Sequence, residues 1–131
     1  LAALRAVARH LAPQGRFVFD SRNPVRAEWR DWTPEASREV LAHPELGQVA
    51  SWNDVTQDRE TGIVTYTTVY EVAGAPPLTA QSRIAFPARG EIAETLAGAG
   101  LAAGIWWGGW DRCPFTPDAP EIIPFGGLLP G

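Results

Sequence analysis

Two clusters of polar side chains in this sequence are candidates for chemistry, and the first is Asp20-Ser21-Arg22-Asn23, directly after the apolar run 17–19. Asp20 could orient a substrate or accept a proton, or it could cap the next turn. Arg22 could hold an acidic group with its forked guanidinium, or lie solvated in a loop. Asn23 precedes Pro24, a pair that initiates turns, so a structural role competes with substrate binding.

The second cluster pairs Trp110 with Asp111 in a glycine-rich stretch. An aromatic wall beside a carboxylate can grip a small substrate, although tryptophan packs equally well in a core. Other aromatic residues are candidates for a lid over a substrate, with hydrophobic filling as their alternative role; they are Trp29, Trp32, Trp52, Tyr66 and Tyr70. The predicted substrate-binding set is Asp20, Arg22, Asn23, Trp29, Tyr66, Trp110 and Asp111, and no catalytic base is identified.

Composition excludes several classes of function. The net charge is -4 and no Lys/Arg cluster is present, which argues against a nucleic-acid partner. His10 and His43 stand apart from other ligand residues, so we predict no metal site. Cys113 is the only cysteine, so no internal disulfide can form, which suits the cytoplasm. No apolar run approaches the ~20 residues of a membrane span.

The elements that must position the first cluster are a helix and a strand. Apolar residues recur at helical spacing over 1–11; they are Leu1, Leu4, Val7, Ala8 and Leu11. Pro13 and Gly15 end this helix. The run 17–19 has no polar position, which predicts a strand covered on both faces. Ligands in parallel sheets gather beyond the carboxyl ends of the strands, where Asp20 to Asn23 would lie.

Residues 25–86 read as an insertion. Thr33 can cap a short helix over 34–41 with Pro34 at its first position. Three strands follow, over 47–56, 63–72 and 78–86, joined by turns at 58–62 and 74–77, so we expect an antiparallel meander with one face more apolar than the other.

The last third predicts a helix over 88–101, a strand over 102–107, a loop over 108–112 and an antiparallel strand over 121–127. Gly100 is the expected end of the helix. Pro124 cannot donate a ladder hydrogen bond, so it should restrict the last strand to a sheet edge or a bulge.

The sequence motifs of these segments resemble those of a known family. The run L-x-x-L-x-x-V-x-x-x-L-x-P-x-G-R-F-V-F-D-x-R-N-P over 1–24 is similar to a helix and the fifth strand of small-molecule, S-adenosylmethionine-dependent methyltransferases of class I, although Gln14 replaces the first glycine of their L-x-P-G-G. E-I-x-x-x-L-x-x-A-G-L over 91–101 resembles their last core helix. Residues 108–114 and 120–125 resemble their G-x-W-D…P and S-E-x-I-x-V.

This resemblance implies an α/β chain, the C-terminal part of a doubly wound Rossmann-like sheet with an antiparallel β insertion. Its parts would be 1–24, with the fifth strand; 25–86, a lid or dimer contact; and 87–131, with the sixth and seventh strands. The chain opens in mid-helix and contains no methionine or glycine-rich cofactor motif. S-adenosylmethionine would therefore be bound mainly by a missing N-terminal half, and the fragment alone would be inactive and self-associating, with a homodimer through the insertion or the bare sheet edge.

Two other hypotheses remain open. A non-catalytic ligand-binding or dimerisation module would pair 17–19 antiparallel with the meander, whereas the methyltransferase hypothesis requires 17–19 to run parallel to 102–107. A methyltransferase scaffold that has lost its activity and serves assembly is the third. The methyl acceptor and the atom methylated are not specified by the sequence.

Overall fold

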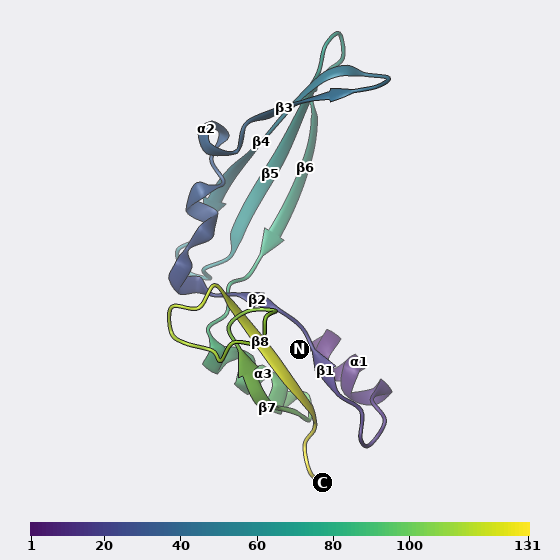
Figure 1. Cartoon of the computed structure of the whole chain (residues 1–131), viewed down its shortest axis with the longest axis vertical. Coiled ribbons are helices and arrows are strands. Elements are labelled where there is room, and N and C mark those ends of the chain that lie inside the picture. The colour runs from purple at the N-terminus through teal and green to yellow at the C-terminus, as the bar shows by residue number, and fades with distance from the viewer. The chain divides into compact units, whose positions relative to one another are not determined.

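The computed structural model describes residues 1–131, and the chain divides into two compact units. The first unit contains residues 1–26 and 87–131, and the second contains residues 27–86. In Figure 1 the first unit carries both chain ends and the second carries the long strands β4, β5 and β6. Each unit is described by itself. None of the helices in the chain is long and apolar enough to cross a membrane.

The first unit has two principal helices, α1 (Ala2–His10) and α3 (Arg89–Gly98). Leu4, Ala8 and Leu11 pack against the core, as the helical spacing predicts. Leu1 and Val7 remain exposed, although the same spacing placed them on the apolar face. Helix α3 begins where the Glu91 carboxylate accepts a hydrogen bond from the Ala88 backbone amide at 2.8 Å, which satisfies a donor at the helix start.

The sheet of the first unit is built around β8 (Glu121–Leu128). Strands β1 (Phe17–Val18) and β2 (Ser21–Arg22) pair antiparallel with one edge of β8, and β7 (Leu101–Trp107) pairs antiparallel with the other. Phe17 and Ala103 both face Gly126 in the register. Since β1 and β7 are each antiparallel to the same strand, they point the same way, as the methyltransferase hypothesis requires. The antiparallel pairing of 17–19 with the meander that the rival hypothesis needs is wrong.

Pro124 lies in the middle of this sheet, so the edge alternative of the prediction is wrong. The bulge alternative is closer, because the register of β7 with β8 is irregular between Ala103 and Ile105, beside the partner of Pro124. The proline is fully buried and pairs with Trp106 of β7. On the other side the ladder stops after Val18 and resumes at Ser21, and the register would place Phe19 opposite Pro124. Because proline has no N–H to donate, the interruption between β1 and β2 accommodates it within a central strand.

The core of the first unit lies between the two helices and one face of the sheet. Its buried residues are Phe17, Ile92, Leu96, Ala99, Leu101 and Ile122. The expectation that residues 17–19 are covered on both faces is wrong, because Val18 is 44% exposed. Side chains alternate along a strand, so Val18 shares the opposite face with its partner Phe125 and with Ile105, which is 47% exposed.

The second unit is a four-stranded antiparallel meander, in the order β3 (Glu39–His43), β4 (Gly47–Gln57), β5 (Val64–Val72) and β6 (Leu78–Ile84). Helix α2 (Pro34–Ser37) begins as predicted, with the Ala36 amide donating to the Thr33 hydroxyl at 3.2 Å. It ends at Ser37, so the helix expected over 34–41 is too long and a fourth strand was missed. Residues 39–43 pair with β4 through a tight turn in which Gly47 has a φ of +74°; this pairing outweighs their local helical tendency.

Candidate functional site

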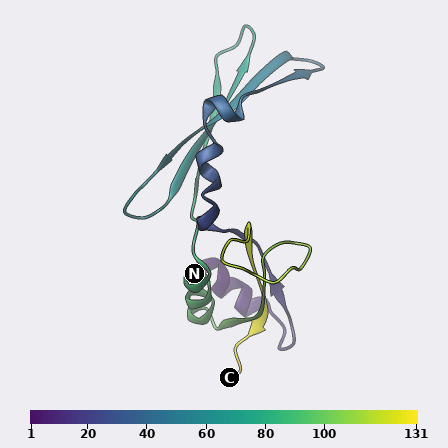
Figure 2. The same cartoon turned by 60° about the vertical axis from the view of Figure 1, so that its left-hand side comes forward.

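The carboxyl ends of β2 and β7 lie beside one another, on the two sides of Glu121. Arg22, at the end of β2, faces Glu121 in the register. On the other side the Glu121 amide donates to the carbonyl of Gly108, the first residue after β7, at 3.2 Å. The two predicted polar clusters of the first unit therefore meet where β2 and β7 end. We call this region, residues 20–23 and 108–113, the strand-end rim. Figure 2 shows the yellow-green loop after β7 beside the start of β8.

Asn23 joins the two sides of the strand-end rim. Its side-chain amide donates to the carbonyls of Pro117 at 3.0 Å and Ala119 at 2.7 Å, and its backbone amide donates to Pro120 at 3.0 Å. Its side-chain oxygen accepts from the Val25 amide at 3.2 Å. The residue is only 3% exposed. These contacts give Asn23 the structural role weighed in the sequence, and they fix the loop 114–120 against the end of β2.

Asp20 is exposed and lies in the interruption between β1 and β2, directly before Ser21. Arg22 is also exposed and has an interaction partner in the structure. A carboxylate and a guanidinium on one exposed strand end can orient a polar substrate, and the carboxylate can accept a proton. Their part in binding stays a prediction.

The loop after β7 presents Trp110 to solvent. Trp110 is 56% exposed, so it is not a core residue. The loop closes on itself where the Gly108 amide donates to the Cys113 carbonyl at 2.8 Å and Arg112 takes a φ of +65°. A side chain on Gly108 would approach the Ala119 side chain to 2.7 Å, so glycine is required for this close packing. The exposed indole is held at the strand-end rim by an internally bonded loop.

Asp111 is coupled to Cys113. Its carboxylate accepts a hydrogen bond from the Cys113 backbone amide at 3.1 Å. Hydrogen bonds from the side chain and the backbone of Cys113 lower the pKa of Asp111 below its ordinary value. The same side-chain contact raises the pKa of the Cys113 thiol. Asp111 is thus a stable anion, and Cys113 is a poor nucleophile at neutral pH.

Arg89 is a residue near the rim that sequence reasoning missed. Its guanidinium carbon lies 5.0 Å from the ring centre of Trp106 and 5.6 Å from that of Phe115, both within the range of cation–π attraction. The Phe115 amide donates to the Trp106 carbonyl at 3.1 Å, which holds the two rings together. No local signal in the sequence indicates this contact, because it joins a helix start to a distant strand and loop.

Trp29 and Tyr66 belong to the second unit and form an aromatic cluster there with Trp32 and Phe86. The ring centres of Trp29 and Phe86 are 4.5 Å apart. Trp32 meets Tyr66 edge-on at 5.3 Å and Phe86 at 6.1 Å. This cluster matches the hydrophobic filling weighed as the alternative for these residues.

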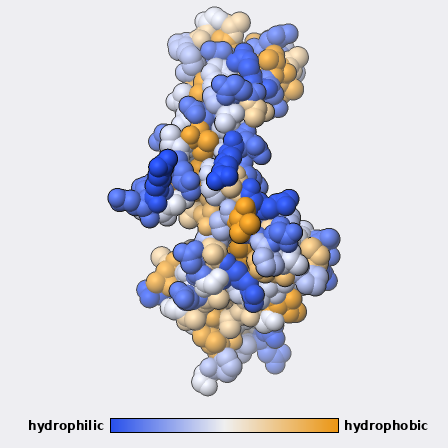
Figure 3. All heavy atoms as spheres, turned by 90° about the vertical axis from the view of Figure 1, so that its left-hand side faces the viewer, coloured by the Kyte–Doolittle hydropathy of each residue, from blue (hydrophilic) through white to orange (hydrophobic).

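Tyr66 also borders a polar groove of about 350 Å³ in the second unit. The Thr68 hydroxyl donates to the Asn53 side-chain oxygen at 2.8 Å, and the Asn53 backbone amide donates to the Ser37 hydroxyl at 2.7 Å. The remaining lining residues are Glu39, Ser51, Trp52 and Tyr70. On the face in Figure 3, hydrophobic residues form separate patches among hydrophilic ones.

Neither histidine has ligand residues around it. His10 Nδ1 lies 2.7 Å from the Ala6 carbonyl, and His43 Nδ1 accepts hydrogen bonds from the Glu45 and Leu46 amides at 3.2 and 3.3 Å. The described residues contain no group of three or more His, Cys, Asp or Glu side chains arranged to hold a metal ion.

Comparison with known proteins identifies the fold. No protein-family model and no curated protein matches the sequence. Among solved structures, the CcbJ methyltransferase from Streptomyces caelestis is similar, with a TM-score of 0.70 and 16% identity over 96% of this chain and 51% of that one. An S-adenosylmethionine-dependent methyltransferase from Clostridium acetobutylicum ATCC 824 has a TM-score of 0.72 and 13% identity, over 97% of this chain and 50% of that one.

A third similar structure is the sugar N-methyltransferase KedS8 from Streptoalloteichus sp ATCC 53650. It has a TM-score of 0.62 and 18% identity, over 98% of this chain and 48% of that one. The chain thus spans about half the length of the structures it matches and shares their fold over that half. The resemblance to S-adenosylmethionine-dependent methyltransferases inferred from the sequence is confirmed at the level of the fold.

Proposed function

We propose that this chain is the C-terminal half of a class I, S-adenosylmethionine-dependent methyltransferase that acts on a small molecule. One observation carries the proposal: β1 and β7 point the same way on the two sides of the antiparallel β8, with polar loops at their shared carboxyl ends. Ligands of open α/β sheets bind outside such ends. The likeness to half of three methyltransferases supports the same conclusion.

The described residues do not form a cradle for the cofactor. Phosphate- and nucleotide-binding turns lead from a strand through glycines into a helix, whose backbone amides face the ligand. In the first unit the glycines after β7 lead into a loop and then into β8, which is a strand. We therefore assign cofactor binding mainly to residues outside this sequence.

S-adenosylmethionine supplies an electrophilic methyl group on a sulfonium, and its transfer needs alignment and exclusion of water more than it needs a metal. In this proposal the strand-end rim forms part of the acceptor site. Trp110 presents an apolar surface there, and the anion of Asp111 offers a hydrogen-bond acceptor to an amine or hydroxyl. Asp20 is the second exposed carboxylate of the rim, and we assign it the proton that an acceptor loses.

The acceptor class follows from the rim's chemistry. One aromatic surface with carboxylates suits a small polar compound carrying an amine or hydroxyl, and the name of KedS8 describes a sugar N-methyltransferase. We place the protein in the cytoplasm, because a single exposed cysteine fits a reducing compartment. A role of the insertion as a lid or in a homodimer belongs to the same proposal.

Calorimetry with S-adenosylhomocysteine tests this proposal on the natural full-length protein. We expect saturable binding with a stoichiometry near one per chain. Absence of saturable binding would contradict the proposed function. The 131-residue chain alone is the matched control and is expected to give no saturable heat.

A further inference from the structure

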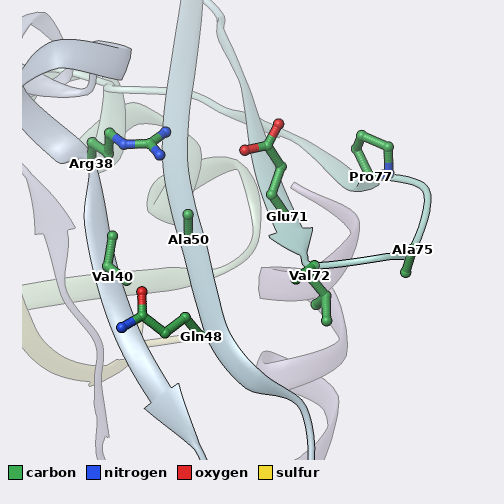
Figure 4. Close-up of a pocket in the computed structure, with 9 residues that line it drawn as sticks. Arg38, Val40, Gln48, Ala50, Glu71, Val72, Ala75 and Pro77 are labelled. Atoms are coloured by element: carbon green, nitrogen blue, oxygen red, sulfur yellow. The ribbon is translucent and has the colours of Figure 1, made fainter.

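One cleft in the second unit has opposite charges on its two walls. It measures about 520 Å³ and is formed by β3, β4, β5 and the turn before β6. In the register, Val40, Ala50 and Glu71 lie in one row across three strands. Figure 4 shows Arg38 and Glu71 on the two sides of β4, with the small Ala50 side chain between them. Because the Ala50 side chain is short, the cleft between Arg38 and Glu71 stays open.

Arg38 is held in place without an acidic partner. Its guanidinium carbon lies 5.1 Å from the ring centre of Trp52, and cation–π attraction of this kind orients the planar group while leaving its N–H donors available. Within residues 1–131, the Arg38 side chain makes no ion pair and no hydrogen bond. The guanidinium is therefore a preoriented anion binder on one wall.

Glu71 is the complementary group on the other wall. Its carboxylate is exposed and turned toward β4 (Figure 4), and it makes no ion pair with Arg38. Neighbouring strands are spaced by ~4.8 Å, so the backbones of β3 and β5 are roughly 10 Å apart. Arg38 directly precedes β3, and it and Glu71 lie on the two sides of β4 (Figure 4). Val40 supplies apolar surface beside Ala50, with which it pairs.

We propose that this cleft binds a small molecule with an anionic group at one end and an ammonium group at the other. The anion would pair with Arg38, the ammonium with Glu71, and a short aliphatic segment would lie over Ala50. The cleft's volume is within the ~300–1,000 Å³ of small-ligand pockets. The cleft lies on the opposite sheet face from Tyr66 and Thr68, because side chains alternate along β4 and β5. The site is independent of the proposed methyl transfer.

Nuclear magnetic resonance titration with 6-aminohexanoate tests the proposal. We expect saturable shift changes at Val40, Ala50 and Glu71, with millimolar affinity. Hexanoate and hexylamine, which each lack one charged end, should bind about threefold to fivefold more weakly, as expected for the loss of one exposed ion pair. Equal affinity for hexanoate would overturn the two-ended site, and no saturable change with 6-aminohexanoate would overturn the site altogether.

Charge-removing variants separate this site from general surface electrostatics. Arg38→Gln and Glu71→Gln should each weaken 6-aminohexanoate binding by about threefold to fivefold, whereas Arg38→Lys should retain part of the affinity. Arg59→Gln and Glu60→Gln are matched controls in the β4–β5 turn. They should leave the affinity for 6-aminohexanoate unchanged. Unaltered binding to Arg38→Gln, with the circular dichroism spectrum of the wild type, would contradict the proposal.

Discussion

The side chain of Asn23 donates a hydrogen bond to the carbonyl of Ala119 at 2.7 Å, across 96 positions of the sequence. This contact fixes the loop after β7 against the end of β2. Together with the pairing of Glu121 with Arg22 and with Gly108, it holds the two polar clusters of the first unit at one rim. The methyltransferase proposal depends on that shared rim, because it places Asp20, Trp110 and Asp111 at the same end of the sheet.

Asn23→Ala should destabilise the first unit by about 2–3 kcal/mol, because the buried carbonyl of Ala119 and the part-buried contact to Pro117 lose their donor. Urea unfolding monitored by circular dichroism measures this change. Asn23→Asp retains the acceptor to the Val25 amide but not the donors, so it should cost a similar amount. Gln14→Ala is the control on an exposed loop and should change the free energy of unfolding by less than about 0.5 kcal/mol. An unchanged free energy of unfolding for Asn23→Ala would refute the structural role of Asn23.

Gly126→Ala should destabilise the protein by about 3 kcal/mol or more, because the new methyl group would lie 1.8 Å from the Ala102 carbonyl oxygen and β7 would have to move. Thermal unfolding measures the effect. Gly104→Ala is the matched control, since a methyl group there meets no atom within 4 Å. If both variants unfold at the wild-type temperature, the close pairing of β7 with β8 is contradicted.

Asp111→Asn should increase the reactivity of Cys113 toward iodoacetamide at a given pH. The Asp111 contact raises the thiol pKa, so removing its charge returns this pKa toward the ordinary value and enlarges the thiolate fraction. The pH profile of the alkylation rate should therefore move to lower pH. Asp118→Asn is the control. Asp118 lies in the same loop but accepts its hydrogen bond from the Thr116 hydroxyl, so this variant should leave the pH profile unchanged. An unchanged profile for Asp111→Asn would contradict the coupling.

The 131-residue chain should self-associate through the uncovered part of the first unit's sheet. Val18 and Ile105 are both about half exposed on one face, and the outer edge of β1 has no strand partner; exposed edges and apolar faces promote association. Val18→Lys should reduce the mass measured by light scattering at high concentration. Val25→Lys, at a position 70% exposed, is the control. A monomeric wild type would contradict this prediction.

Sequence patterns predicted the elements that have strong local signals. Periodicity predicted the helix face at Leu4 and Ala8, and capping chemistry predicted the Thr33 cap. The resemblance to a family predicted the direction of β1 relative to β7. Strand β3 was missed because all its residues are exposed, so no burial pattern distinguishes it from a helix; its partner β4 determines its conformation.

The remaining differences depend on tertiary contacts. Pro124 was predicted at an edge or a bulge because a proline breaks a ladder. The gap between β1 and β2 and the register shift in β7 let a central strand contain it. The site residues divide similarly: Asn23 and Asp111 have contacts that explain their positions, whereas the stacking of Arg89 on Trp106 and of Arg38 on Trp52 requires a register that local sequence does not encode.

The central claim is tested most directly by amide hydrogen exchange of the natural full-length protein with and without S-adenosylhomocysteine. Methyl transfer requires the sulfur of the cofactor to lie next to the acceptor site, so the ligand should border the strand-end rim even though other residues hold most of it. The methyltransferase account therefore predicts that saturating ligand slows exchange at the strand-end rim, residues 20–23 and 108–113, and leaves the β4–β5 turn at 58–62 unchanged. Exchange at the strand-end rim that is identical with and without the ligand would contradict the account.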